Sequence, residues 1–385
     1  MMTKRGRRWL RRGVLTTILV LVLLAAVATW FHSESIESRL LAISPVAPAL
    51  DIEIIGSGGD TITLARTDAS AREGVWGLEW EGGYAVVGEI VTESPETVTR
   101  HLSTIDGEIV TGAPAAIDPF AARSDPADVG VDYQDVVFDG PLGEYPAWLT
   151  AGSDDTWVVF VHGKDTNRRE ALRILPTMAA LGFPTFDITY RGDPEAPPYE
   201  GRHDLGRTEW EDLEAAVLHA LGSGAHDVVI VGYGMGAAVA SQFLHLSPWA
   251  DRVQGVIFDA PLLDPGRVVD AEAERRNIPG FMTVLAKTLA EARFGLKWDL
   301  VDQIERAGRF DVPILVLHGE DDERIPVEGS RLLAEARPDL VILATFPGAG
   351  DAWNADPARY EDVVGAFLAD QALGSSDLDR VVPEG

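Results

Sequence analysis

Four polar turns, each directly after a run of apolar residues, hold the side chains that could do chemistry in this chain. The runs are Trp157–His162, Asp227–Val231, Pro313–His318 and Val341–Phe346. Continuous apolar runs are typical of parallel strands that are buried on both faces. The carboxyl ends of such strands meet at one edge of a sheet, where ligands bind. We therefore expect one site there, whose acids or oxygen ligands would be Asp321, Asp322 and Asp351, with His162 and His318 packed or hydrogen-bonded beneath it.

The order and spacing of these turns resemble those of the α/β-hydrolase fold family, specifically bacterial serine hydrolases related to prolyl-peptidase and esterase members. The resemblance covers about residues 133–370. It implies that the His162-Gly163 turn helps to form an oxyanion hole. It also implies that Gly232-Tyr233-Gly234-Met235-Gly236 is the elbow that normally reads Gly-x-Ser-x-Gly, with the nucleophilic serine on a strained turn. Asp322 then occupies the acid position of the triad, with Asp321 as a near neighbour, and the turn Gly348–Asp351 is where the histidine belongs.

Two positions depart from that pattern. Gly234 stands where the serine belongs, and glycine has no side chain that could attack a carbonyl carbon. Asp351 stands where the histidine belongs, and beside Asp322 its charge would be repelled, which should raise one of the two pKa values. Ser241 is no substitute, because it lies seven residues along the following helix, about 10 Å from the elbow. None of the eight histidines follows the last apolar run: His32, His101, His162, His203, His219, His226, His245 and His318.

An oxyanion hole is what the expected site retains, built from the Met235 amide and an amide near Lys164. Such a remnant gives about 10³–10⁴-fold acceleration over water, against roughly 10⁶–10¹⁷-fold for enzymes. We therefore predict a pseudoenzyme without serine-hydrolase activity, which binds a small ligand, a peptide or an envelope protein. The alternatives are an active hydrolase of esters or peptides that uses other residues, and a structural envelope protein.

Two other chemistries fit parts of the same turns. Gly232, Gly234 and Ala237 after a strand, with Asp259 at the end of the next strand, match the spacing of a dinucleotide-binding turn. The strand is not the first of the sheet, which argues against that reading. Asp321, Asp322 and Asp351 could hold a hard cation. We predict neither a metal nor a cofactor.

The elements that must position this site begin near residue 133. Strand-like runs alternate with amphipathic stretches up to residue 372, which predicts a doubly wound, mostly parallel sheet with helices on both faces. Residues 262–310 read as helices without a strand and should form a small cap. Residues 373–385 read as a flexible tail.

A second, smaller unit precedes this domain. Residues 51–111 contain short strand-like runs and the hairpin signal Glu81-Gly82-Gly83, and we predict an all-β accessory domain. Residues 112–132 contain three prolines and read as a linker. Residues 32–50 should be a short connector that ends in Pro45 and Pro48.

The N-terminus combines a basic segment, residues 1–12, with an apolar segment, residues 13–31. Val14 to Phe31 would rise about 27 Å as a helix, close to the roughly 30 Å of a bilayer core. Basic residues before it and acids after it predict a cytoplasmic N-terminus and extracytoplasmic domains. A cleaved signal peptide is the alternative, because Ala26-Val27-Ala28 resembles a cleavage site.

Composition limits the partners. The chain has 385 residues, a formal net charge of −29 and no cysteine. So acidic a chain lacks the basic surplus that nucleic-acid binding needs. Without cysteine, disulfides, thiolate metal sites and a cysteine nucleophile are excluded. We thus expect a membrane partner and no nucleic-acid partner.

Overall fold

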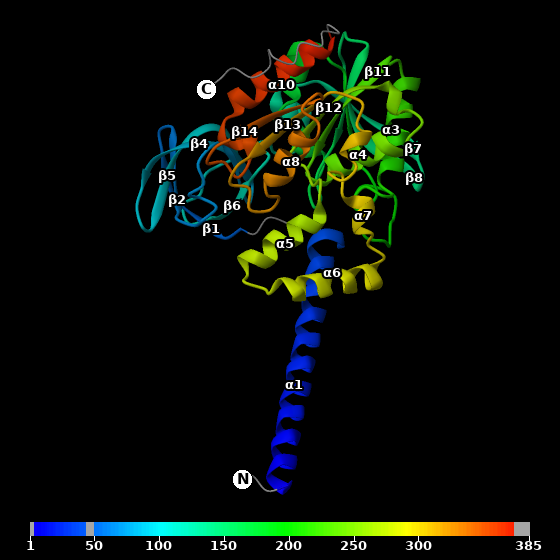
Figure 1. Ribbon diagram of the computed structural model, residues 1–385. Helices are drawn as coiled ribbons and strands as arrows, with labels where there is room; N and C mark the ends of the chain where they lie inside the picture. The colour runs from blue at the N-terminus through cyan, green and yellow to red at the C-terminus, as the bar shows by residue number, and fades with distance from the viewer. Residues whose placement is uncertain (1–3, 44–49, 373–385) are drawn as a thin grey trace.

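The molecule consists of a large domain, a small barrel beside it and a long helix that projects away from both (Figure 1). The computed structural model describes residues 4–43 and 50–372. Pro45 and Pro48 of the expected connector, and the expected tail 373–385, lie outside the described residues.

Eight strands form the sheet of the large domain, in the order β14-β13-β12-β11-β9-β10-β8-β7. β8 pairs antiparallel with β7 and β10, and the other neighbours are parallel. The predicted doubly wound, mostly parallel sheet is therefore confirmed. The strands are β7 (Tyr133–Gly140), β8 (Gly143–Thr150), β9 (Thr156–Val161), β10 (Thr185–Ile188), β11 (Asp227–Tyr233), β12 (Val253–Asp259), β13 (Ile314–Gly319) and β14 (Val341–Phe346).

Each face of this sheet has its own hydrophobic core, because successive side chains of a strand point to opposite faces. In β9, Val159 and Val161 belong to one core, whereas Val158 and Phe160 belong to the other. The first core is covered by α3 (Trp210–Gly222), α4 (Met235–Leu246) and α8 (Glu328–Ala336). The second is covered by α2 (Leu175–Leu181), the short α9 (Ala352–Ala355) and α10 (Pro357–Ala372).

A helical cap interrupts the alternation between β12 and β13, as predicted. It contains α5 (Pro265–Arg275), α6 (Gly280–Phe294) and α7 (Trp298–Val301). Residues 260–313 are all described and contain no strand. In Figure 1, α5 and α6 lie at the end of the large domain from which α1 emerges.

Six antiparallel strands close into the accessory barrel, in the order β1-β2-β5-β4-β3-β6. They are β1 (Ile52–Gly58), β2 (Thr61–Ala65), β3 (Trp76–Trp80), β4 (Gly83–Glu93), β5 (Thr97–Asp106) and β6 (Pro114–Asp118). The expected linker 112–132 was wrong at its start, since β6 pairs with both β1 and β3 and thereby closes the barrel. Its proline begins the strand, which is a position where proline is tolerated.

The barrel is attached to the large domain by side chains near the expected site. Asp118, at the end of β6, accepts hydrogen bonds from Tyr84 of the barrel and from Arg169 of the large domain. Asn354 of α9 donates to the carbonyls of Val75, at 2.6 Å, and Pro119, at 2.9 Å.

The long helix α1 runs over Lys4–Ile36 and continues as a π-helical turn, Glu37–Leu41. It is long and apolar enough to cross a membrane, and little of its apolar part is buried within the protein. Part of the expected connector, residues 32–50, packs on the large domain. Ile36, Leu40 and Leu41 are buried in a core of the large domain, and the His203 amide donates to the Leu41 carbonyl at 2.8 Å.

Candidate active site

The elbow between β11 and α4 keeps the backbone shape that a nucleophile needs. Gly234 has φ +49° and lies directly before α4. Its amide donates to the Asp259 carbonyl and its carbonyl accepts from the Leu262 amide, each at 2.9 Å. Two backbone hydrogen bonds therefore hold a residue with positive φ and ψ −107°, a sparsely populated conformation that costs other residues roughly 1–3 kcal/mol.

The three elbow glycines have different reasons to be glycine. A Cβ atom at Gly232 would lie 2.7 Å from Cα of Ala237, and one at Gly236 would collide with the Val161 carbonyl. At Gly234, the nearest atoms to such a Cβ would be Ile325 Cδ1 at 3.7 Å and Gly163 Cα at 3.9 Å, which are ordinary contacts. The position of the missing serine thus has room for a side chain.

The turn after β13 holds Asp322 by the backbone. Oδ1 of Asp322 accepts from the amides of Arg324, at 2.7 Å, and Ile325, at 3.0 Å. His318 lies buried below, with Nε2 2.8 Å from the Ile325 carbonyl and Nδ1 2.7 Å from Ser330 Oγ. Asp321, next to Asp322, donates its amide to the Ala349 carbonyl, which joins this turn to the one after β14.

Asp351 contacts an arginine rather than an acid. Both of its carboxylate oxygens lie 3.2 Å from Nη1 of Arg173, which is almost completely buried. Oδ1 also accepts from the Asn354 amide at 3.0 Å and so caps α9. The charge of Asp351 is therefore compensated by Arg173, and its side chain forms part of the turn, while the expected repulsion with Asp322 stays a prediction.

Arg173 is the centre of a buried ionic network. Its guanidinium lies 3.7 Å from Asp259, 3.9 Å from Glu170 and 5.4 Å from the ring centre of Tyr233. Tyr360 donates a hydrogen bond to Asp259 at 2.9 Å. Burial raises the pKa of Asp259 to about 7, and the charge of Asp351 adds to this rise while Arg173 opposes it. Arg173 thus forms ion pairs with Asp259 at the end of β12 and with Asp351 in the turn after β14.

The His162-Gly163 turn after β9 is held by a second set of polar contacts. His162 Nε2 lies 2.7 Å from Asp193, and its ring stacks on Tyr190 with 4.5 Å between ring centres. Burial alone would lower the pKa of His162, but the Asp193 carboxylate and the Gly163 carbonyl raise it to about 9.

One amide of this turn is already occupied. The Gly163 amide donates to Glu170 at 2.7 Å. The expected oxyanion donors, the amides of Met235 and Lys164, have no hydrogen-bond partner within residues 4–43 and 50–372. The Lys164 ammonium forms an ion pair with Asp165.

Sequence reasoning missed the charges that surround the vacant positions. Glu170 and Arg173 lie between β9 and β10, where we predicted an amphipathic stretch and assigned no site residue. Asp193 follows β10, and the argument from strand ends would have found it if applied to that strand as well. The pairing of Arg173 with Asp351 has no sequence signal, since 178 positions separate the two residues.

The alternative chemistries gain no geometric support. Asp259 is buried against Arg173 and Tyr360, so its carboxylate does not face a ligand as a ribose-binding acid would. Within the described part of the chain, no three histidines or acids come together as metal ligands do.

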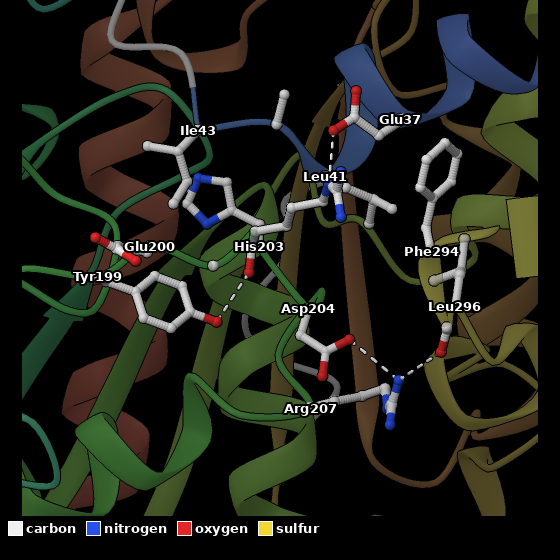
Figure 2. Close-up of a pocket in the computed structure, with 14 residues that line it drawn as sticks. Glu37, Leu41, Ile43, Tyr199, Glu200, His203, Asp204, Arg207, Phe294 and Leu296 are labelled. Carbon is white, nitrogen blue, oxygen red and sulfur yellow. Dashed lines mark hydrogen bonds and ion pairs between the residues drawn. The ribbon is translucent and has the colours of Figure 1, made fainter.

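A cavity of about 600 Å³ lies between the π-helical turn after α1, the loop before α3 and the end of α6 (Figure 2). Its wall combines apolar Leu41, Phe294 and Leu296 with two ion pairs. Arg202 pairs with Glu37 at 2.6 Å, and Arg207 pairs with Asp204 at 3.1 Å.

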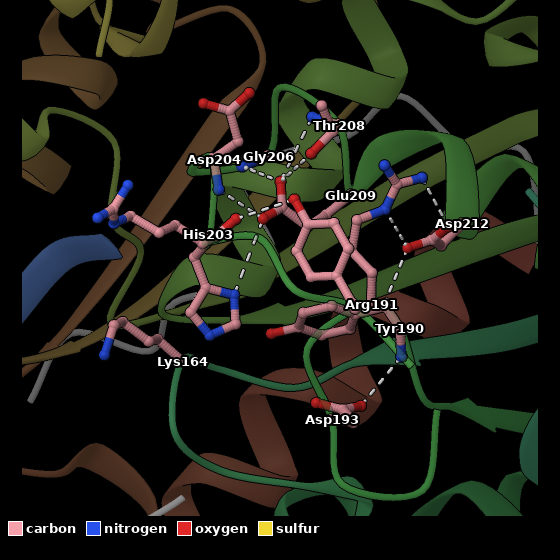
Figure 3. Close-up of polar contacts among 12 residues, drawn as sticks. Lys164, Tyr190, Arg191, Asp193, His203, Asp204, Gly206, Thr208, Glu209 and Asp212 are labelled. Atoms are coloured by element: carbon pink, nitrogen blue, oxygen red, sulfur yellow. Dashed lines mark hydrogen bonds and ion pairs between the residues drawn. The ribbon is translucent and has the colours of Figure 1, made fainter. Parts of the chain in front are cut away.

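The cavity wall at His203 is backed by a buried acid. His203 lines the cavity, and Nδ1 of its buried ring lies 3.8 Å from Oε1 of Glu209. Glu209 is completely buried, and the amides of Asp204 and Gly206 donate to it at 2.7 and 3.0 Å (Figure 3). These hydrogen bonds, together with His203, outweigh burial and lower the pKa of Glu209.

Comparisons with known proteins agree with this architecture. Residues 152–302 match the family of serine aminopeptidases S33, and residues 53–118, most of the barrel, match a domain of unknown function (DUF8805). Human Protein ABHD12B is 26% identical over 205 residues, which cover 49% of this chain and 54% of that protein. The match therefore spans about half the length of this curated relative.

Solved structures show the same fold at low sequence identity. An esterase from Pyrococcus furiosus matches with a TM-score of 0.52 and 17% identity, over 65% of this chain and 95% of that chain. A puromycin-hydrolyzing peptidase from Mycobacterium tuberculosis matches with a TM-score of 0.52 and 18% identity, over 76% of this chain and 47% of that chain.

Proposed function

We propose that this chain, a member of the α/β-hydrolase family, is a membrane-anchored pseudoenzyme that binds a ligand or partner instead of hydrolysing one. One observation carries the proposal: at the two triad positions where proton transfer and attack would occur, Gly234 has no side chain and Asp351 is paired with the buried Arg173. The Asp351 carboxylate is engaged as the ion-pair partner of Arg173 and as the cap of α9, and does not stand free beside the elbow.

The remaining parts of the site support binding rather than turnover. The Met235 amide at the start of α4 could still attract an oxygen of a ligand, since the N-terminus of a helix favours negative charge. The cavity beside the π-helical turn is a second candidate binding site, and its wall contains cations, acids and apolar side chains. A ligand with both polar and apolar parts fits that lining.

The anchoring part of the proposal rests on α1. The described helix includes an apolar stretch of bilayer length, with arginines before it and acids after it. This order favours a cytoplasmic N-terminus, and we therefore propose that the sheet domain and the barrel lie outside the cytoplasm.

Activity is tested with the full chain, a fluorophosphonate probe and p-nitrophenyl esters. We expect neither labelling nor turnover above the buffer rate. Covalent labelling of any serine in the wild-type chain would overturn the pseudoenzyme proposal and favour an active hydrolase that uses other residues.

Restoration is the matched experiment. Gly234→Ser supplies a nucleophile for which the elbow has room, and Asp351→His supplies a base. We expect labelling in the double variant and not in Gly234→Ser alone. If the single variant reacts as fast as the double variant, a base exists outside position 351.

A further inference from the structure

Helix α6 exposes an apolar face that the proposed function does not use. Phe281 and Val284 are each 63% exposed and Leu285 is 51% exposed. Thr288 and Ala292 complete the exposed side of the helix, and the partly exposed Glu291 borders it next to Val284. These five positions follow helical spacing and therefore form one continuous face.

The neighbouring cap helix is the natural comparison. α5 exposes Arg267, Asp270, Glu274 and Arg275, as a helix facing water is expected to do. α6 belongs to the same cap and is covered by α1 and α5 on its other side, where Thr283, Ala286 and Ala290 are buried. An apolar exposed face of this kind marks an interaction site.

The contact between α6 and α1 indicates what covers this face. Arg293, near the end of α6, donates to Ser33 at 3.1 Å and pairs with Glu34 at 2.6 Å. Its guanidinium also lies 3.8 Å from the ring centre of Trp30. These partners lie at the end of the apolar part of α1, at the level where a spanning helix leaves the bilayer and where tryptophan is enriched.

The orientation of α6 is consistent with a helix that lies at the bilayer surface. In Figure 1, α6 runs across α1 at the end of the large domain from which α1 emerges. If α1 spans the bilayer, α6 lies along the surface of the bilayer. Amphipathic helices in this position bury their apolar face at the boundary between headgroups and acyl chains.

We infer that α6 is an interfacial helix whose face Phe281, Val284, Leu285, Thr288 and Ala292 inserts into the lipid surface beside α1. This inference rests on the proposed anchoring by α1 and adds a second membrane contact to it. The cap, and with it the cavity bounded by Phe294 and Leu296, is then fixed against the membrane at two points.

The absence of cysteine from the natural sequence allows a direct test with single labels. The full chain is reconstituted in nanodiscs of phosphatidylcholine and phosphatidylglycerol, with one environment-sensitive fluorophore attached at Phe281→Cys or Leu285→Cys. Leu218→Cys on α3 is the matched control, since it is an exposed leucine of another helix. Val22→Cys, in the apolar part of α1, reports the anchor.

We expect nitroxide lipids to quench the labels at 281 and 285 several-fold more than the label at 218, and aqueous iodide to do the reverse. The inference fails if 281 and 285 behave like 218 while 22 remains quenched by lipid, and the anchor then stands. If iodide also quenches the label at position 22, then the proposed anchoring by α1 and the inference about α6 both fail. Protection from iodide without quenching by lipid would mean that a second copy or another protein covers the face, which also overturns the inference.

Discussion

At the elbow after β11, the chain keeps the backbone of a nucleophile turn and leaves space above Gly234, whereas the turns around it are filled with buried charge. The elbow is held by backbone hydrogen bonds and has ordinary contact distances for an added Cβ. The turn after β14 is held by Asp351, which pairs with Arg173 and caps α9.

The difference teaches that the two positions where the chain departs from the expected triad are not alike. Gly234 leaves a vacancy that one substitution fills. Asp351 has become part of the structure, because its carboxylate compensates a buried cation and satisfies a helix terminus. The barrel also holds this turn in place, since Asn354 of α9 donates a hydrogen bond to the Val75 carbonyl. The following variants test that contrast, from the largest expected effect to the smallest.

Arg173→Met removes the cation at the centre of the network. Asp259 and Glu170 then lose their compensating charge in a buried setting, and removal of one partner of a buried ion pair typically costs about 3–5 kcal/mol. We expect a loss of that size in the free energy of unfolding, measured by urea denaturation of the full chain in detergent. A loss below about 1 kcal/mol, the range of surface ion pairs, would show that the network is solvated.

The contacts of His162 predict that the free energy of unfolding depends on pH. The pKa of His162 is about 9 in the folded chain and 6.5 in a free histidine, so the folded state holds an extra proton between these values. This contribution is complete below pH 6.5 and is lost as the pH rises through 9, a change of about 3 kcal/mol. Asp193→Asn should flatten the decline in unfolding free energy over that interval. An unchanged slope in this variant would contradict the assigned role of Asp193.

Asp351→His should destabilise the chain by about 2 kcal/mol, because it removes the charge opposite Arg173 and the acceptor that caps α9. Asp351→Asn is the control, since asparagine keeps a capping oxygen, and we expect about half of that loss. Thermal unfolding of both variants provides the measurement. Equal losses would mean that the cap contributes nothing here.

Gly234→Ser should have the smallest effect, about 1 kcal/mol, because a backbone with positive φ is strained for serine although the space is free. Gly236→Ser is its counterpart and should cost far more, since its Cβ would collide with the Val161 carbonyl. If the two variants unfold at the same temperature, the elbow is not the open position that its geometry indicates.

Much of the architecture could be predicted from local patterns. Continuous apolar runs such as Pro313–His318 identify buried parallel strands, and the missing strand in 262–310 identifies the cap. β6 was assigned to a linker because Pro114 suggested a loop, yet the closure of the barrel depends on pairing with β1 and β3, which are distant in sequence. The docking of residues 36–41 was missed for the same reason.

The catalytic roles of the site residues, Asp322 among them, and the outward orientation of the domains remain predictions. The identity of the residues at 234 and 351, the lack of cysteine and the apolar length of the first helix were determined by the sequence alone, because they are properties of residue type and local spacing. The tertiary structure decided which residues surround positions 234 and 351. Whether Asp351 faces another acid or Arg173, and whether the exposed side of α6 meets water or lipid, depends on long-range packing that brings distant residues to one place.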